Sequence, residues 1–160
     1  MVSHYLEEDA SAIEHAEYEL KRVDHLIYVS LKYTRTVDVI KNIISRLIST
    51  LDYVWVDLLE QAEKKKLVYE IPPAPGARST LLKKLYGDDE ELVEFIKFYQ
   101  LLRQFNQAEY TAHREFRRHV AMKAVFANGD VQELNIDVIT EYYEKTRDFL
   151  AYMRKTYYES

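Results

Sequence analysis

The stretch VDVIKNIISRLISTLDYVWVDL, residues 37–58, decides the fold. Its apolar side chains recur every three or four residues, which is the period of one face of an α-helix. The members of this stripe are Val37, Ile40, Ile44, Leu47, Leu51, Val54 and Leu58. No glycine or proline interrupts it. The pattern therefore predicts a long helix with one buried face.

A second apolar stripe precedes the first one in a different helical phase. Its members are Ile13, Ala16, Leu20, Val23 and Ile27. Continuing this stripe would place Lys41 in the core, so the register changes between Ser30 and Thr36, where Thr34 or Thr36 can cap a new helix. One continuous helix over residues 11–66 would be roughly 84 Å long. We therefore predict a helical hairpin over about 11–66, with one long bent helix paired to a second chain as the alternative.

Breaks and caps divide the rest of the chain. Pro72-Pro73-Ala74-Pro75-Gly76 holds all three prolines and predicts a connector over residues 71–78. Capping boxes at Ser11 with Glu14 and at Asp88 with Glu91 mark helix starts. Further helices are expected at 79–86, at 88–105, from Glu109 to the stop at Asn128-Gly129-Asp130, and from a cap at Asn135 to about residue 157. The prediction is one all-α domain over 1–160, an antiparallel up-and-down bundle of four or five helices, with the C-terminal helices over about 88–157.

Composition supports one core and limits the function classes. The chain has 160 residues, of which 48% are hydrophobic, and it has no cysteine, which excludes disulfides and thiolate metal sites. The acidic start, Met1 to Asp9, argues against a secretory signal, and no apolar run approaches the roughly 18 residues that span a bilayer. We expect a cytoplasmic protein with no cofactor and no membrane contact. The net charge of −5 repels nucleic acid on average, but it does not exclude a local basic patch that attracts it.

One segment concentrates positive charge in this acidic chain. Residues 113–119, HREFRRH, hold three arginines and two histidines, and Lys123 follows. Arginine presents a planar fork of donors to phosphate, and histidine exchanges a proton near neutral pH. The segment is therefore the candidate site of the sequence.

Helical spacing sorts the side chains of this segment. Ala112, Phe116, Val120 and Ala127 would share the core side of a helix, with His113 as a hydrogen-bonded histidine at the edge of the core. Arg114 and His119 would flank the opposite sector, which contains Glu115, Arg118 and Met122. Glu115 precedes His119 by one turn and could accept its ring proton.

The cluster resembles a motif of the HEPN (higher eukaryotes and prokaryotes nucleotide-binding) domain superfamily. That motif is an arginine, a polar residue and a histidine four to six positions after the arginine, near the start of a late helix in a small bundle. Arg114, Glu115 and His119 match it, although the polar residue is more often Asn, Asp or His. The resemblance implies a metal-independent endoribonuclease in which two motifs meet at a homodimer interface. Other members bind nucleotides or partner proteins beside a nucleotidyltransferase.

The resemblance assigns roles to the cluster. Two copies of His119 would serve as base and acid, and Arg114 would stabilise charge on the phosphate. Arg117, Arg118 and Lys123 would hold backbone phosphates of RNA. Met122 and Phe126, expected to be exposed, would form the dimer interface. The alternatives are a non-catalytic nucleotide- or partner-binding module and a purely structural helical dimer.

Metal sites are disfavoured by spacing. No Glu-x-x-His pair occurs, so a carboxylate-bridged di-iron bundle is not expected. A mononuclear site built from His15, His25 and His113 stays open, but structural histidines explain these residues better. We expect no metal, and the fourteen tyrosines are scattered over every predicted helix as packing residues rather than base-stacking ones.

Overall fold

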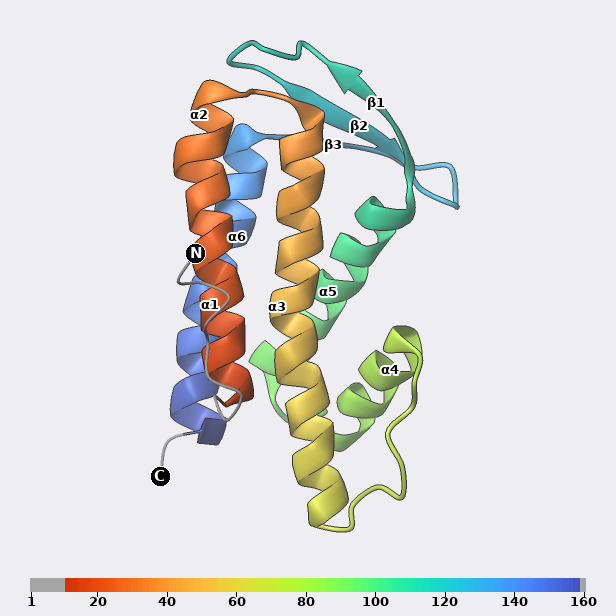
Figure 1. Ribbon diagram of the computed structural model, residues 1–160. Helices are drawn as coiled ribbons and strands as arrows, with labels where there is room; N and C mark the ends of the chain where they lie inside the picture. Colours follow the sequence, from red (N-terminus) through yellow and green to blue (C-terminus); the bar gives the residue numbers. More distant parts are fainter. Residues whose placement is uncertain (1–10, 159–160) are drawn as a thin grey trace.

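The computed structural model describes residues 11–158, so the acidic start of the chain lies outside the described residues. The helices are α1 (Ala12–His25), the π-helix Leu26–Ser30, α2 (Leu31–Tyr33), α3 (Val37–Lys64), α4 (Pro75–Leu85), α5 (Glu90–Gln107), α6 (Ile136–Met153) and the π-helix Arg154–Tyr158. The strands are β1 (Glu109–His113), β2 (Ala121–Val125) and β3 (Val131–Asn135). Figure 1 shows α1, α3, α5 and α6 alternating in direction, with a small sheet at one end.

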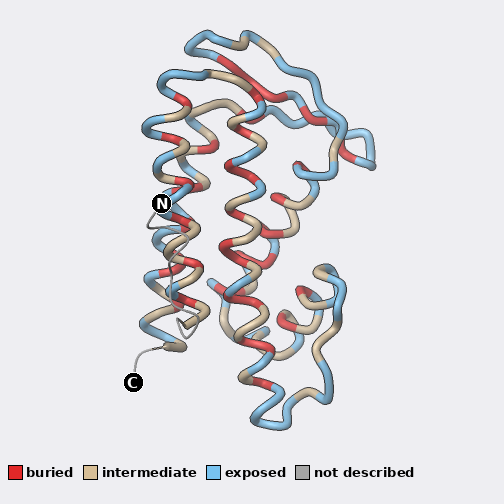
Figure 2. The backbone as a smooth tube through the Cα atoms, in the orientation of Figure 1, coloured by how far each residue is buried: buried red, intermediate tan, exposed pale blue. Residues whose placement is uncertain are grey.

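Helix α3 is the centre of the molecule, as the quoted stretch predicts. It contacts α1, α4, α5, α6 and β2, and its apolar stripe is fully buried (Figure 2). The hairpin is confirmed: the chain turns at residues 34–36, and the Thr36 side chain accepts a hydrogen bond from the Val39 N–H. The alternative of one long bent helix paired to a second chain is therefore wrong. The capping box of Ser11 and Glu14 is also present.

Two helix boundaries differ from the sequence-based ones. Helix α4 begins at Pro75, inside the expected connector, because proline is well suited to the first turn of a helix, where its missing N–H costs nothing. Helix α5 is capped by Asp89 rather than by Asp88, and its carboxylate accepts from the Leu92 N–H at 3.1 Å. The cap at Asn135 is confirmed, since its side chain accepts from the Val138 N–H.

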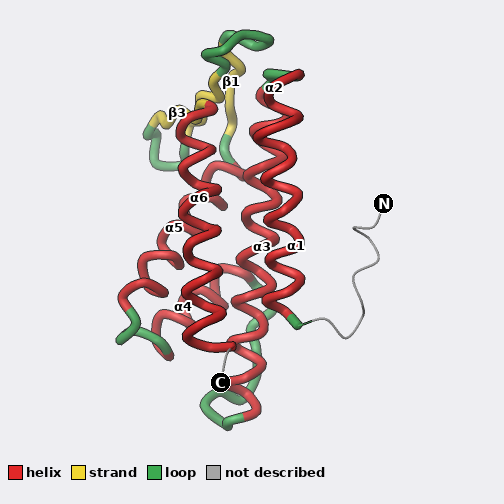
Figure 3. The backbone as a smooth tube through the Cα atoms, turned by 90° about the vertical axis from the view of Figure 1, so that its left-hand side faces the viewer, coloured by secondary structure: helices red, strands yellow, loops and turns green. Residues whose placement is uncertain are grey.

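The helix expected between Glu109 and Asn128 is wrong. Residues 109–135 form a three-stranded antiparallel sheet in the order β1-β2-β3, inserted between α5 and α6 (Figure 3). Asn128-Gly129-Asp130 is the turn of a hairpin: the Phe126 N–H donates to the Asp130 carbonyl, and Gly129 has a φ of 93°. The all-α prediction is corrected to a mostly helical fold with a small sheet.

The two faces of the sheet differ. Strand register places Met122 beside Leu134 on the face that packs against the bundle, and both are fully buried. Lys123 pairs with Thr111 and Glu133 on the outer face, where all three are exposed. The alternation of strand side chains thus separates a core face from a polar face.

The expected exposure of Met122 and Phe126 is consequently wrong. Met122 is 0% exposed and Phe126 7%, and the Phe126 ring packs edge-on against Phe105 at 5.0 Å. Neither side chain can form a dimer interface. Phe116, expected in the core, is instead 75% exposed, because it lies in the loop between β1 and β2.

Tyrosine hydroxyls satisfy the carboxylates at the opposite end of the bundle. Tyr152 and Tyr157 both donate to Asp89, at 2.8 and 2.7 Å. Tyr158 donates to Asp57 at 2.6 Å. These bonds fix the C-terminal turn of the chain against α3 and α5. No helix in the described part of the chain combines the length and apolarity that crossing a bilayer requires.

Candidate functional site

The loop between β1 and β2, residues 114–120, is docked onto the turn that precedes α3. The Phe116 N–H donates to the Arg35 carbonyl at 2.6 Å, and Glu115 accepts from the Val37 N–H at 2.9 Å. Arg114 and Phe116 adopt φ values of 55° and 65°, which non-glycine residues rarely occupy. Because that conformation is costly, the two hydrogen bonds are what hold the loop in place.

Glu115 therefore has a different role from the one expected. Its carboxylate accepts from the first N–H of α3, where the helix dipole favours negative charge. The expectation that Glu115 accepts the ring proton of His119 is wrong. Glu115 positions the loop, and it lines neither of the hollows described below.

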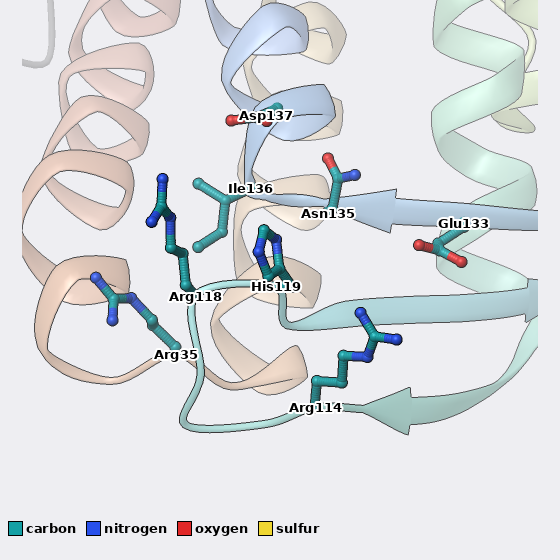
Figure 4. A pocket seen from close by; sticks show the side chains of 8 residues that line it. All are labelled: Arg35, Arg114, Arg118, His119, Glu133, Asn135, Ile136 and Asp137. Atoms are coloured by element: carbon teal, nitrogen blue, oxygen red, sulfur yellow. The ribbon is translucent and has the colours of Figure 1, made fainter.

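The docked loop forms one wall of a hollow of about 380 Å³ (Figure 4). Its lining residues are Arg35, Arg114, Arg118, His119, Glu133, Asn135, Ile136 and Asp137. Three segments supply them: the turn before α3, the β1–β2 loop, and the junction of β3 with α6. In Figure 4 the His119 ring stands between Arg118 and Asn135. A volume of this order suits a nucleotide-sized ligand.

Positive charge in this hollow is unpaired. Within residues 11–158, Arg35, Arg114 and Arg118 form no ion pair, although Glu133 and Asp137 line the same space. Each guanidinium keeps its donors available to a ligand. Phosphate and carboxylate are the groups that a guanidinium binds with two parallel hydrogen bonds. The start of α6, at the same hollow, adds the positive end of its helix dipole.

A smaller hollow of about 160 Å³ adjoins the first on the outer face of the sheet. Its lining residues are His113, Arg114, His119, Ala121, Lys123 and Glu133. The residues common to both hollows are Arg114, His119 and Glu133. The His113 ring Nε2 lies 2.8 Å from the Thr111 hydroxyl, so the expected hydrogen bond is present. His113 is half-buried on the sheet and belongs to this site rather than to the edge of a helical core.

Four of the six residues predicted for catalysis and RNA binding come together, and Glu115 and Arg117 do not. Arg114, Arg118 and His119 line the main hollow, and Lys123 lines the smaller one. Arg117 is exposed and lines neither.

Sequence reasoning missed the residues contributed from outside the basic segment. These are Arg35, Ala121, Glu133, Asn135, Ile136 and Asp137. The hairpin signal at Asn128-Gly129-Asp130 could have placed Glu133 opposite Lys123. No local signal links Arg35 to a loop that lies about 80 residues further on.

Metal binding is not supported in the part of the chain that the structure describes. No three or more His, Asp or Glu side chains there group as ligands. His15 stacks on Tyr53 with 5.2 Å between ring centroids, and His113 bonds Thr111 on the sheet. The open alternative of a site shared by His15, His25 and His113 is therefore not formed.

Comparison of the chain with protein-family models, curated proteins and solved structures finds no match. Arg114 and His119 lie in a β-hairpin loop, whereas the resemblance to the HEPN superfamily expects them on a helix.

Proposed function

We propose that this protein binds RNA, and that the hollow beside α6 takes one phosphate-flanked nucleotide of a single strand. The observation that carries the proposal is the set of three guanidiniums, from Arg35, Arg114 and Arg118, that share one hollow without an ion pair in the described residues. Unpaired cations close together repel one another, and a phosphate relieves that repulsion.

The shape of the site supports a single strand rather than a duplex. The hollow is nucleotide-sized, and single-stranded RNA presents unstacked nucleotides that can enter such a space. The Phe116 ring, 75% exposed in the same loop, offers an aromatic surface on which a neighbouring base can stack. A free nucleotide would use the same phosphate contacts with less affinity.

Binding to a labelled single-stranded RNA tests the proposal directly. Arg118→Ala should weaken binding by about tenfold or more, since a hydrogen bond to a charged group contributes about 1.5–3 kcal/mol. Arg117→Ala is the matched control, because Arg117 lies in the same loop but lines neither hollow. Its affinity should stay within about twofold of the unmodified protein. Equal losses in the two variants would show that the hollow is not the binding site.

A second candidate function, metal-independent cleavage of RNA, is favoured by the two histidines of the smaller hollow. His113 and His119 both line it beside Arg114. One imidazole would take the proton of the ribose 2′-hydroxyl as that oxygen attacks phosphorus. The other would protonate the 5′-oxygen as its bond to phosphorus breaks. A single chain would then hold both the base and the acid, which the sequence interpretation assigned to two subunits.

Cleavage is separable from binding by mutation. His119→Ala and His113→Ala should each abolish formation of 2′,3′-cyclic phosphate ends in the presence of a chelator, while affinity for RNA falls by only about threefold. Full cleavage by either variant would eliminate this candidate. Uncut RNA bound by the unmodified protein would leave binding as the function.

A further inference from the structure

A second group of cations lies on the α1–α3 hairpin, outside the hollow described above. These side chains surround a hollow of about 410 Å³. Its lining residues are Tyr18, Lys21, Arg22, His25, Leu26, Asn42 and Arg46. Three of them carry permanent positive charge and none is a carboxylate, in a chain whose net charge is −5.

Helical spacing explains how these residues meet. Tyr18, Arg22 and His25 recur at intervals of four and three on α1, so they share one face of that helix. Asn42 and Arg46 are four apart on α3, which packs against α1. The two columns therefore face a common groove.

The cations of this groove keep donors available. Lys21 and Arg22 are exposed, and their side chains make no ion pair or hydrogen bond within the described chain. Glu19 holds the Nη1 atom of Arg46 at 3.3 Å, and the other two nitrogens of that guanidinium form no hydrogen bond with residues 11–158. Glu19 thus orients Arg46 without occupying its whole donor edge. The π-helix that starts at Leu26 borders the groove, and such irregular turns recur at functional sites.

Both hollows border α3 or the turn before it, since Arg35 lines the first and Asn42 and Arg46 line the second. Arg35 lies two residues before Val37, the first residue of α3, and Asn42 and Arg46 follow Val37 by five and nine residues. At 1.5 Å per residue these intervals correspond to roughly 8 and 14 Å along the helix. A few nucleotides of one strand are long enough to cover this axial distance. Asp38, exposed on the first turn of α3, is the acidic residue between them.

We propose that Lys21, Arg22 and Arg46 form a second phosphate subsite for the RNA strand whose neighbouring nucleotide occupies the hollow beside α6. The inference rests on the proposed function and adds the direction of the strand across the protein. RNA too short to reach the α1–α3 groove would bind through the first hollow alone.

The test compares a long and a short RNA on one pair of variants. Lys21→Ala with Arg22→Ala should weaken binding of an oligonucleotide of about 16 nucleotides by about tenfold, and leave the affinity for a dinucleotide within about twofold. The slope of log affinity against log salt should fall by about 1.4, since each phosphate contact on single-stranded nucleic acid contributes about 0.7. Asp38→Asn should strengthen binding of the long RNA.

The control removes the same charge elsewhere. Lys64 and Lys65 are exposed at the other end of α3, and Lys64→Ala with Lys65→Ala should leave both affinities and the salt slope unchanged. Equal losses in the two double variants would reduce the effect to net charge and overturn the inference. An unchanged salt slope in the Lys21 and Arg22 variant would also overturn it.

The same experiment separates this inference from the function on which it rests. If Arg118→Ala weakens both RNAs while Lys21→Ala with Arg22→Ala weakens neither, the second subsite is refuted and the first site stands. If Arg118→Ala has no effect on either RNA, the proposed function fails instead, whatever the groove variants do.

Discussion

The charged side chains at the two ends of the bundle differ in whether they have partners within the described residues. At the end away from the sheet, Asp89 and Asp57 each accept a short hydrogen bond from a tyrosine hydroxyl that anchors the C-terminal turn. At the sheet end, Arg35, Arg114 and Arg118 surround a hollow and form no ion pair within the described residues. The first arrangement stabilises the fold, and the second leaves its charge for a ligand.

The difference separates the side chains whose removal should lower stability from those whose removal should weaken binding. A partnered carboxylate loses hydrogen bonds when it is removed, and it leaves its donors unsatisfied. An unpartnered cation leaves nothing behind, and its removal even relieves repulsion.

Asp89→Ala should lower the free energy of unfolding by about 3 kcal/mol, as measured by urea denaturation. The substitution removes the N-cap of α5, which contributes about 1 kcal/mol, and two tyrosine hydrogen bonds of about 1 kcal/mol each. Asp88→Ala is the matched control and should cost less than about 0.5 kcal/mol, because Asp88 is exposed and is not the cap. Similar losses of stability in both variants would show that the hydrogen bonds of Asp89 do not stabilise the fold.

Part of the Asp89 contribution should depend on pH. Burial raises the pKa of Asp89, but hydrogen bonds from Tyr157, Tyr152 and the backbone N–H groups outweigh it, so the pKa lies below its usual value. A carboxylate with a lowered pKa stabilises the fold above its unfolded pKa of about 3.9, and this contribution is lost as the pH falls through the lower folded value. Asp89→Asn should therefore flatten the acid side of the stability profile. An unchanged acid side would contradict the assignment.

Glu115→Ala should cost about 1 kcal/mol, less than the loss at Asp89. The variant loses the hydrogen bond to the Val37 N–H at the start of α3 and the favourable charge beside the helix dipole. Because Glu115 also anchors the β1–β2 loop, RNA affinity should fall although Glu115 does not line the hollow. Glu115→Gln keeps an acceptor oxygen and should recover part of both losses. Weaker binding without any loss of stability would instead indicate direct contact of Glu115 with RNA.

The smallest change in stability is expected at the opposite end. Arg35→Ala with Arg118→Ala should alter the free energy of unfolding by less than about 0.5 kcal/mol, in either direction, because neither guanidinium has an ion-pair partner within residues 11–158. RNA affinity should nevertheless fall by about a hundredfold. A destabilisation comparable to that of Asp89→Ala would show that these arginines serve the fold.

The helical hairpin was predictable because its signals are local. The phase change between two apolar stripes required a turn near Thr36, and the structure has its cap there. The cap at Asn135 followed from the same logic. A cap residue and a stripe act within one or two turns of helix, so they can be read without knowledge of the rest of the fold.

The sheet was missed because apolar residues of this segment fit the helical period in one part and the strand period in another. Ala112, Phe116 and Val120 satisfy a helical spacing, while Met122, Ala124 and Phe126 alternate as a strand with one buried face. The turn at Asn128-Gly129-Asp130 was interpreted as a helix stop, although Asn-Gly between alternating apolar residues favours a hairpin. Because of that interpretation, Met122 and Phe126 were expected to be exposed.

The candidate site was only half predictable for a related reason. Arg114, Arg118 and His119 stand out as a basic cluster in an acidic chain, whatever structure they adopt. Whether these side chains face the hollow depends on two positive φ angles and on the docking of the loop beside Arg35. Such contacts between distant segments are set by tertiary packing, which leaves no local pattern in the sequence.

The hydrogen bond from Phe116 to Arg35 also bears on when the protein becomes competent during synthesis. The turn holding Arg35 leaves the ribosome before the β1–β2 loop and the first turn of α6, which emerge some 80 to 100 residues later. A nascent chain that has folded only its first hairpin lacks two of the three walls of the hollow. A ligand that needs all three walls can therefore bind only after the last of them has been synthesised.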